Sequence, residues 1–239
     1  MIPNNSTGTG ANDGNCPLYP GAFLSDPLQG PHTYRTVDMQ ANGIFQGYRW
    51  YDLHGKTPLS PFGHGLSYTR FSYANLTVTP NVGAMTVAFD VTNSGTVQGD
   101  EVPQVYVGST ALPPVPLAVR ALAGFERVSL APGQTKHVTI ELAPRAFQYW
   151  SVAAHDWATA WGDRQIVVGS SSRDIRLSTI DAPLKPAAEE VLDLLAAVQN
   201  VGPGSGLETK VQDIQAAIAA GTSEPRATGS LPSRTRCRR

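Results

Sequence analysis

The chain has 239 residues, which is enough for one large domain or two modest ones. Its 23 glycines, 19 prolines and charged fraction of 15%, against about 25% in an average protein, indicate a turn-rich and weakly charged fold. No apolar run approaches the ~18 residues of a membrane span, and the chain is acidic outside its five C-terminal arginines. The composition therefore argues against a membrane partner and a nucleic-acid partner.

The two cysteines, Cys16 and Cys237, lie near opposite ends of the chain, and neither has a second Cys or a His at ligand spacing. We therefore expect no disulfide between them, no metal site and no cofactor. The N-terminal residues lack the basic and apolar regions of a signal peptide, so the sequence alone assigns no compartment.

Residues 1–73 contain no pattern of a regular domain. Up to residue 46 the segment is rich in Gly, Asn and Thr and has too few apolar residues for a core of its own. From Gly47 onward it is dense in aromatic residues, and Pro58 and Pro61 interrupt any element longer than a few residues. We predict that this region is a remnant and linker that follow a preceding domain.

Residues 74–180 show short alternating runs separated by turn residues, which is typical of a β-sandwich. The clearest run alternates Met85, Val87, Phe89 and Val91 with more polar or smaller residues. Seven strands are predicted, at 76–78, 85–91, 102–107, 122–130, 138–142, 165–168 and 175–177.

Beyond Pro183 the apolar period becomes helical. We predict a hairpin of two amphipathic helices over residues 184–221, with Val191 in the first apolar stripe and Val211 in the second. The last residues, 222–239, have no periodicity and are predicted to be disordered.

Two motifs before the sandwich resemble a known family. The segments GYRWYD (47–52) and PFGHGLSY (61–68) resemble the region that joins the second and third domains of family 3 glycoside hydrolases, the β-glucosidase and β-xylosidase family. The resemblance continues, in the family's order, through VTNSG (91–95), GDEV (99–102), QVYV (104–107), LAGFE (122–126), LAPG (130–133) and VGSSSRDI (168–175). It implies that residues 74–180 are a fibronectin type III-like, immunoglobulin-like β-sandwich.

The resemblance also implies what this chain lacks. Retaining glycoside hydrolysis needs two carboxylates about 5 Å apart, and in the family these come from domains that precede the sandwich and need far more residues than are present here. We therefore expect a C-terminal fragment without either catalytic carboxylate, inactive alone, whose partners are the catalytic domains of a parent β-glucosidase-like enzyme. A β-linked oligosaccharide is the further partner that the resemblance implies. The helical segment resembles part of a module at the C-termini of some secreted bacterial proteins, which implies a secreted bacterial parent.

The aromatic linker supplies the candidate site residues. His64, between two glycines, and Trp50 are candidates for contact with a sugar. The interpretation we favour is a domain interface formed by Tyr48, Trp50, Tyr51, Phe62, His64 and Tyr68. Without neighbouring domains, we expect Tyr48, Trp50 and Tyr51 to form an exposed apolar patch, because the prolines separate them from the sandwich.

Two carboxylate candidates are set aside. His155-Asp156-Trp157 lies within the sandwich, where the tip of a hairpin is the simpler interpretation. Asp100 and Glu101 are adjacent on a strand and point to opposite faces, so they cannot flank one bond.

The function predicted is thus a non-catalytic stabilising domain. The alternatives are a free-standing carbohydrate-binding or adhesion module that uses Trp157 and Trp161, and a residual enzyme.

Overall fold

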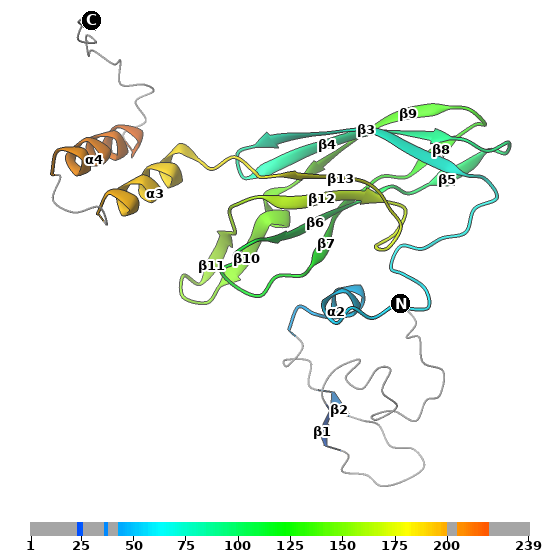
Figure 1. Ribbon diagram of the computed structural model, residues 1–239, viewed down its shortest axis with the longest axis horizontal. Helices are drawn as coiled ribbons and strands as arrows, with labels where there is room; N and C mark the ends of the chain where they lie inside the picture. Colours follow the sequence, from blue (N-terminus) through cyan, green and yellow to red (C-terminus); the bar gives the residue numbers. More distant parts are fainter. Residues whose placement is uncertain (1–22, 26–35, 38–42, 200–204, 220–239) are drawn as a thin grey trace, which may run out of the picture. The chain divides into compact units, whose positions relative to one another are not determined.

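Two antiparallel sheets face each other across a single apolar core in the computed structural model (Figure 1). One sheet has the order β3-β4-β9 and the other has the order β13-β12-β6-β7. The strands of the first sheet are β3 Phe71–Asn81, β4 Ala84–Asn93 and β9 Thr135–Leu142. Those of the second are β6 Gln104–Thr110, β7 Arg120–Phe125, β12 Arg164–Gly169 and β13 Ile175–Asp181. This arrangement confirms the predicted β-sandwich.

The structure describes residues 23–25, 36–37, 43–199 and 205–219. Both cysteines and the tail 222–239, for which disorder was predicted, lie outside these residues. The described residues up to Leu184 form one compact unit, and those from Lys185 form a second. Among the described residues no helix is long and apolar enough to cross a membrane.

Strand β4 shows why the sequence folds this way. Every second residue of the strand is buried, with Val87, Phe89 and Val91 at 0% exposure, as the alternation predicted. Its neighbour β9 presents Val138 and Ile140 in register with Phe89 and Val87. One buried face and one solvated face fix the register, because a slip by one residue would expose the whole apolar set.

The second sheet has a different pattern. Strand β6 lies between β12 and β7 and is buried along almost its whole length. Its apolar run was predicted to begin at Val102, but Pro103, which has no N–H, separates it from the short strand β5 Gly99–Glu101. β5 pairs instead with β8 Val128–Leu130. The predicted single run 122–130 is therefore two strands that pair with different partners.

The hairpin β10 Gln148–Ser151 and β11 Asp156–Thr159 was not predicted as strands. It follows a short 3-10 helix, η1 Pro144–Phe147, and brings Trp150 opposite Trp157, whose rings meet edge to face at 5.6 Å. His155 lies in the turn between the strands, so the hairpin interpretation of this region was correct, although the tip begins earlier. Eleven strands fill residues 71–181 where seven were predicted.

Three other short elements precede the sandwich. β1 Phe23–Ser25 and β2 Thr36–Val37 pair antiparallel. The helix α2 Tyr48–Leu53 forms within the aromatic segment predicted as a loop.

The second unit contains α3 Ala187–Gln199 and α4 Ser205–Ala219, which contact each other. Val191 and Val211 are buried, which agrees with the predicted apolar stripes, whereas Leu192 and Leu194 remain about half exposed. Two helices therefore form where a helical hairpin was predicted.

The burial of Phe89 in the core predicts the effect of its removal on stability. Replacing Phe89, which is fully buried, with Ala should lower the free energy of unfolding by about 3–5 kcal/mol, because the substitution removes apolar contacts and leaves a cavity. Phe125→Ala is the matched control, since that side chain is 65% exposed and its loss should cost about 0.5 kcal/mol or less. Urea unfolding followed by tryptophan fluorescence checks both, and equal losses would contradict the assignment of the core.

Candidate functional site

The helix α2 is attached to the sandwich by a buried carboxylate. The Asp52 side chain is 2% exposed and forms ion pairs with Arg120 on β7, at 3.3 Å from Nε to Oδ2, and with Arg173 in the turn after β12, at 2.8 Å from Nη2 to Oδ1. Arg173 also donates to the Lys56 carbonyl at 2.9 Å, and Arg120 donates to the Ser172 carbonyl at 3.2 Å. Both arginines therefore join the linker to the sandwich.

Burial decides the electrostatics of Asp52. Loss of solvation raises the pKa of this carboxyl above 3.8, and the charges of Arg120 and Arg173 offset only part of that rise. No well-aligned hydrogen bond reaches either carboxylate oxygen from the described residues, so the contacts are chiefly ionic. Removing one partner of such a buried pair is costly, because the other charge is left in a poorly solvated position.

Tyr48 fixes the start of the same helix. Its hydroxyl accepts a hydrogen bond from the backbone N–H of Leu122 at 2.8 Å. Its ring stacks on Phe62 at 4.8 Å and meets Tyr106 edge to face at 6.0 Å. Tyr106 lies on the central strand β6, so the contacts among these three rings pack the linker against the sandwich.

A buried amide fixes the end of the linker. The Gln104 side chain donates to the carbonyls of Gly63, at 3.2 Å, and Ser170, at 2.9 Å, and accepts from the Tyr106 hydroxyl at 2.5 Å. Gly63 has φ +79°, and a Cβ added there would lie 2.1 Å from Oε1 of Gln104. Only glycine fits this approach of the linker to the sheet.

The expectation that Tyr48, Trp50 and Tyr51 form an exposed patch is wrong. Trp50 is 2% exposed and Tyr51 is fully buried, while Tyr48 is half-buried under the contacts described above. Pro58 is itself buried, so the prolines turn the chain back onto the sandwich and do not hold it away. The aromatic residues at the start of the linker are therefore covered by other residues of this chain.

The exposed part of the linker lies further along. Leu66 and Tyr68 are almost completely exposed, at 95% and 101%, and His64 and Phe62 are also exposed. The candidate interface residues thus divide into two sets. Tyr48, Trp50 and Tyr51 are covered by this chain, whereas Phe62, His64 and Tyr68 face outward. Trp50 is 2% exposed and stacks on His54 at 4.1 Å, so no face of its ring is open to a sugar in this structure.

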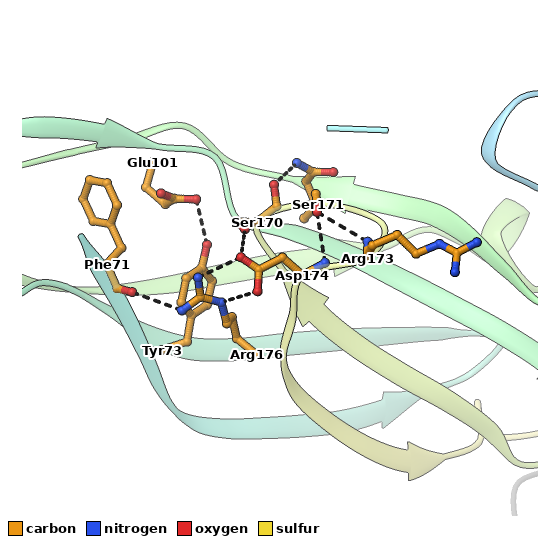
Figure 2. A network of polar contacts seen from close by, with 9 residues as sticks. Phe71, Tyr73, Glu101, Ser170, Ser171, Arg173, Asp174 and Arg176 are labelled. Carbon is orange, nitrogen blue, oxygen red and sulfur yellow. Dashed lines mark hydrogen bonds and ion pairs between the residues drawn. The ribbon is translucent and has the colours of Figure 1, made fainter. Parts of the chain in front are cut away.

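A polar groove of about 580 Å³ lies beside this exposed loop. Figure 2 shows its network: the Tyr73 hydroxyl donates to Glu101 at 3.0 Å, and Arg176 pairs with Asp174 through two contacts of 2.7 Å. Ser170 donates to the second oxygen of Asp174 at 2.7 Å. His64 and Leu66 also line the groove.

Two of the three acids that line the groove, Asp174 and Glu101, have opposite electrostatic environments. The hydrogen bonds from Arg176 hold the pKa of the Asp174 carboxyl below its usual value, whereas burial raises the pKa of the Glu101 carboxyl. Burial, together with the negative charge of Glu101, also raises the pKa of the Tyr73 hydroxyl. Each acid already has a protein partner, so the network holds the turn after β12 against β3 and β5.

Asp100 and Glu101 engage separate partners. Asp100 forms an ion pair with Arg127, while Glu101 accepts from Tyr73. Among the described residues no group of three His, Cys, Asp or Glu side chains could hold a metal ion.

Sequence reasoning missed the residues that attach the linker. Asp52, Arg120, Arg173 and Gln104 were not selected as site residues. The available signal was Asp52 itself, an acid that directly follows Trp50 and Tyr51 within a chain that carries few charges. Its partners lie far along the chain and could not be paired with it from spacing.

The fold and this site define an immunoglobulin-like sandwich with an attached N-terminal linker. Residues 101–172 match the fibronectin type III-like domain family. The chain is 41% identical over 156 residues to the probable β-glucosidase D of Aspergillus niger, which covers 57% of this chain and 20% of the relative.

Solved structures agree with this match. The β-glucosidase DesR from Streptomyces venezuelae, in complex with D-glucose, is 38% identical, with a TM-score of 0.60 over 69% of this chain and 22% of DesR. The GH3 β-glucosidase of Bifidobacterium adolescentis is 33% identical, with a TM-score of 0.59 over 70% of this chain and 26% of that enzyme. The chain therefore contains a fibronectin type III-like domain related to that of family 3 β-glucosidases, which confirms the predicted resemblance. It spans about a fifth to a quarter of the length of these relatives.

Gly63 supplies a test of the attached linker. Gly63→Ala should destabilise the domain by at least about 1–2 kcal/mol, because alanine is strained at this φ and its Cβ would displace the Gln104 amide from its hydrogen bonds. Gly65→Ala is the control, since nothing lies within 4 Å of its added Cβ and its φ lies outside the left-handed region in which side chains are strained. Thermal unfolding of both variants measures the difference, and similar melting temperatures would count against the contact.

The Asp174–Arg176 pair predicts a pH dependence. Because the folded pKa of Asp174 lies below 3.8, its stabilisation is present above that pH and is lost as the pH falls through the folded value. The pair is partly exposed, so Asp174→Asn should cost about 0.5 kcal/mol or less near neutral pH, and the difference from the unmodified chain should shrink as the pH falls through the lowered folded pKa of Asp174. Urea unfolding across pH checks this, and a difference that grows on acidification would have the wrong sign.

Proposed function

We propose that this chain is the non-catalytic accessory domain of a family 3 β-glucosidase-like enzyme and stabilises the catalytic domains by docking through its linker. The observation that carries the proposal is the pair of exposed apolar side chains, Leu66 and Tyr68, on a linker that is otherwise anchored to the sandwich. Exposed apolar side chains that gather in one loop, as Leu66 and Tyr68 do here together with the partly exposed Phe62, are typical of a surface that a partner covers. The relatives are β-glucosidases several times longer than the matched region.

The anchoring matters for such a role. Asp52, Gln104 and Tyr48 hold the linker before the exposed loop, and strand β3 begins directly after it. A docking loop that is fixed at both ends loses little conformational freedom on binding, so more of its contact energy stabilises the complex. His64 and Phe62 belong to the same outward-facing set, and a contact of His64 with a sugar hydroxyl remains part of the proposal.

The alternative, a carbohydrate-binding module, is less well supported by the aromatic residues. Arg145 covers the Trp157 ring at 3.5 Å, Trp150 meets it edge to face, and Trp161 is half-buried. Stacking of a neutral sugar chain needs open, flat ring faces. The geometry therefore favours the accessory role over saccharide binding by Trp157 and Trp161.

A chimera tests the docking role. Residues 43–184 of this chain replace the matched region of DesR, and Leu66→Ser with Tyr68→Ser is introduced into the chimera and into the isolated chain. The double variant should lower the melting temperature of the chimera by about 2–4 °C, because burial of these side chains is lost, and should leave the isolated chain unchanged. The chain alone should hydrolyse no aryl β-glucoside above buffer.

Leu112→Ser is the matched control, since Leu112 is 91% exposed and lies outside the linker. Equal melting of the chimera with and without the double variant would contradict the docking role. Reproducible turnover by the isolated chain would contradict its non-catalytic character.

A further inference from the structure

A second cavity of about 550 Å³ lies beside the β10-β11 hairpin, apart from the linker loop and the polar groove. Apolar side chains from β7 and the loop before it line most of it, together with Phe147, Trp150 and Trp157. Three arginines also line it: Arg49, Arg145 and Arg164. No carboxylate is among its lining residues, although the chain as a whole carries slightly more acidic than basic groups.

Arg164 is the most unusual of the three. It is 4% exposed and donates to the carbonyls of Gly108, at 3.4 Å, Phe147, at 3.3 Å, and Ala160. Its Nε has no hydrogen-bond partner among the described residues, and no carboxylate pairs with it there. Burial alone lowers the pKa of this guanidinium. The positive charge of Arg164 lies at the cavity wall without a carboxylate from the described residues, so an anion in the cavity would stabilise it.

The other two arginines share this lack of a counter-charge. Arg49 Nε is also buried without a hydrogen-bond partner, and neither Arg49 nor Arg145 forms an ion pair within the described part of the chain. Arg145 is held in place by the Trp157 ring, over which its guanidinium lies at 3.5 Å. Such a cation–π contact orients the guanidinium and leaves its N–H groups available.

We propose that this cavity binds an organic carboxylate whose charge is met by the exposed Arg145, with Arg49 and Arg164 adding positive charge to the wall, and whose ring packs on the apolar side chains of β7 and Phe147. Guanidinium groups recognise carboxylates through paired, charge-assisted hydrogen bonds. The size of the cavity and its largely apolar lining with a few polar groups fit a small cyclic ligand. The proposal is independent of the docking role, because the cavity shares no residue with the exposed loop.

Two cyclic acids distinguish the source of the carboxylate. The full chain is titrated with sodium benzoate and sodium glucuronate at constant ionic strength, each beside its neutral counterpart, benzyl alcohol or glucose. Binding is followed by ligand-observed NMR and by tryptophan fluorescence. At least one acid should bind saturably and about ten-fold more tightly than its neutral counterpart, since a charge-assisted contact is lost in the neutral compound. Binding of benzoate alone identifies an aromatic acid, and binding of glucuronate alone identifies a sugar acid.

Variants connect the binding to the cavity. Arg145→Gln should weaken binding of the preferred acid about ten-fold, whereas Arg127→Gln, which removes an exposed arginine paired with Asp100, should leave it unchanged. The proposal is overturned if neither acid saturates, if a neutral counterpart binds as tightly as its acid, or if the two arginine variants weaken binding equally.

Discussion

The ion pairs of the buried Asp52 are the interaction on which the rest of the candidate site depends. A carboxylate with 2% exposure is tolerated only because Arg120 and Arg173 approach it from two different parts of the sandwich. These contacts place α2 beside β7, where Tyr48 reaches the backbone of Leu122. The linker is thereby part of the folded domain and not a tether.

This constraint also determines what remains exposed. Once the linker is attached through Asp52 and Gln104, its aromatic residues up to Tyr51 are buried or half-buried, whereas Leu66 and Tyr68 further along are left uncovered by the described residues. The same domain contains a second buried charge, Arg164, which has carbonyl partners but no carboxylate. One buried charge is thus paired within the chain, and the other defines a cavity suited to an external anion.

The sequence predicted the elements whose pattern is local. Strands β4 and β9 have one buried face, so alternating residues such as Val87 and Ile140 reveal them. The β10-β11 hairpin was missed because its exposed tryptophans give no alternation of apolar and polar residues. The burial of Trp50 could not be predicted from spacing, because it follows from the pairing of Asp52 with arginines far along the chain. The motifs that resemble family 3 enzymes identified the region correctly, but not which of its residues face outward.

Hydrogen exchange tests the central claim most directly. The amide of Lys56 donates to the Tyr51 carbonyl within the linker, at 2.9 Å, and its protection is compared with that of amides in the central strand β4. If the linker is part of the folded domain, the Lys56 amide should exchange with a free energy of opening close to that of β4, and Asp52→Asn should abolish its protection while β4 remains protected. Exchange of Lys56 in the unmodified chain at nearly the rate of an unfolded peptide, with β4 protected, would contradict the account.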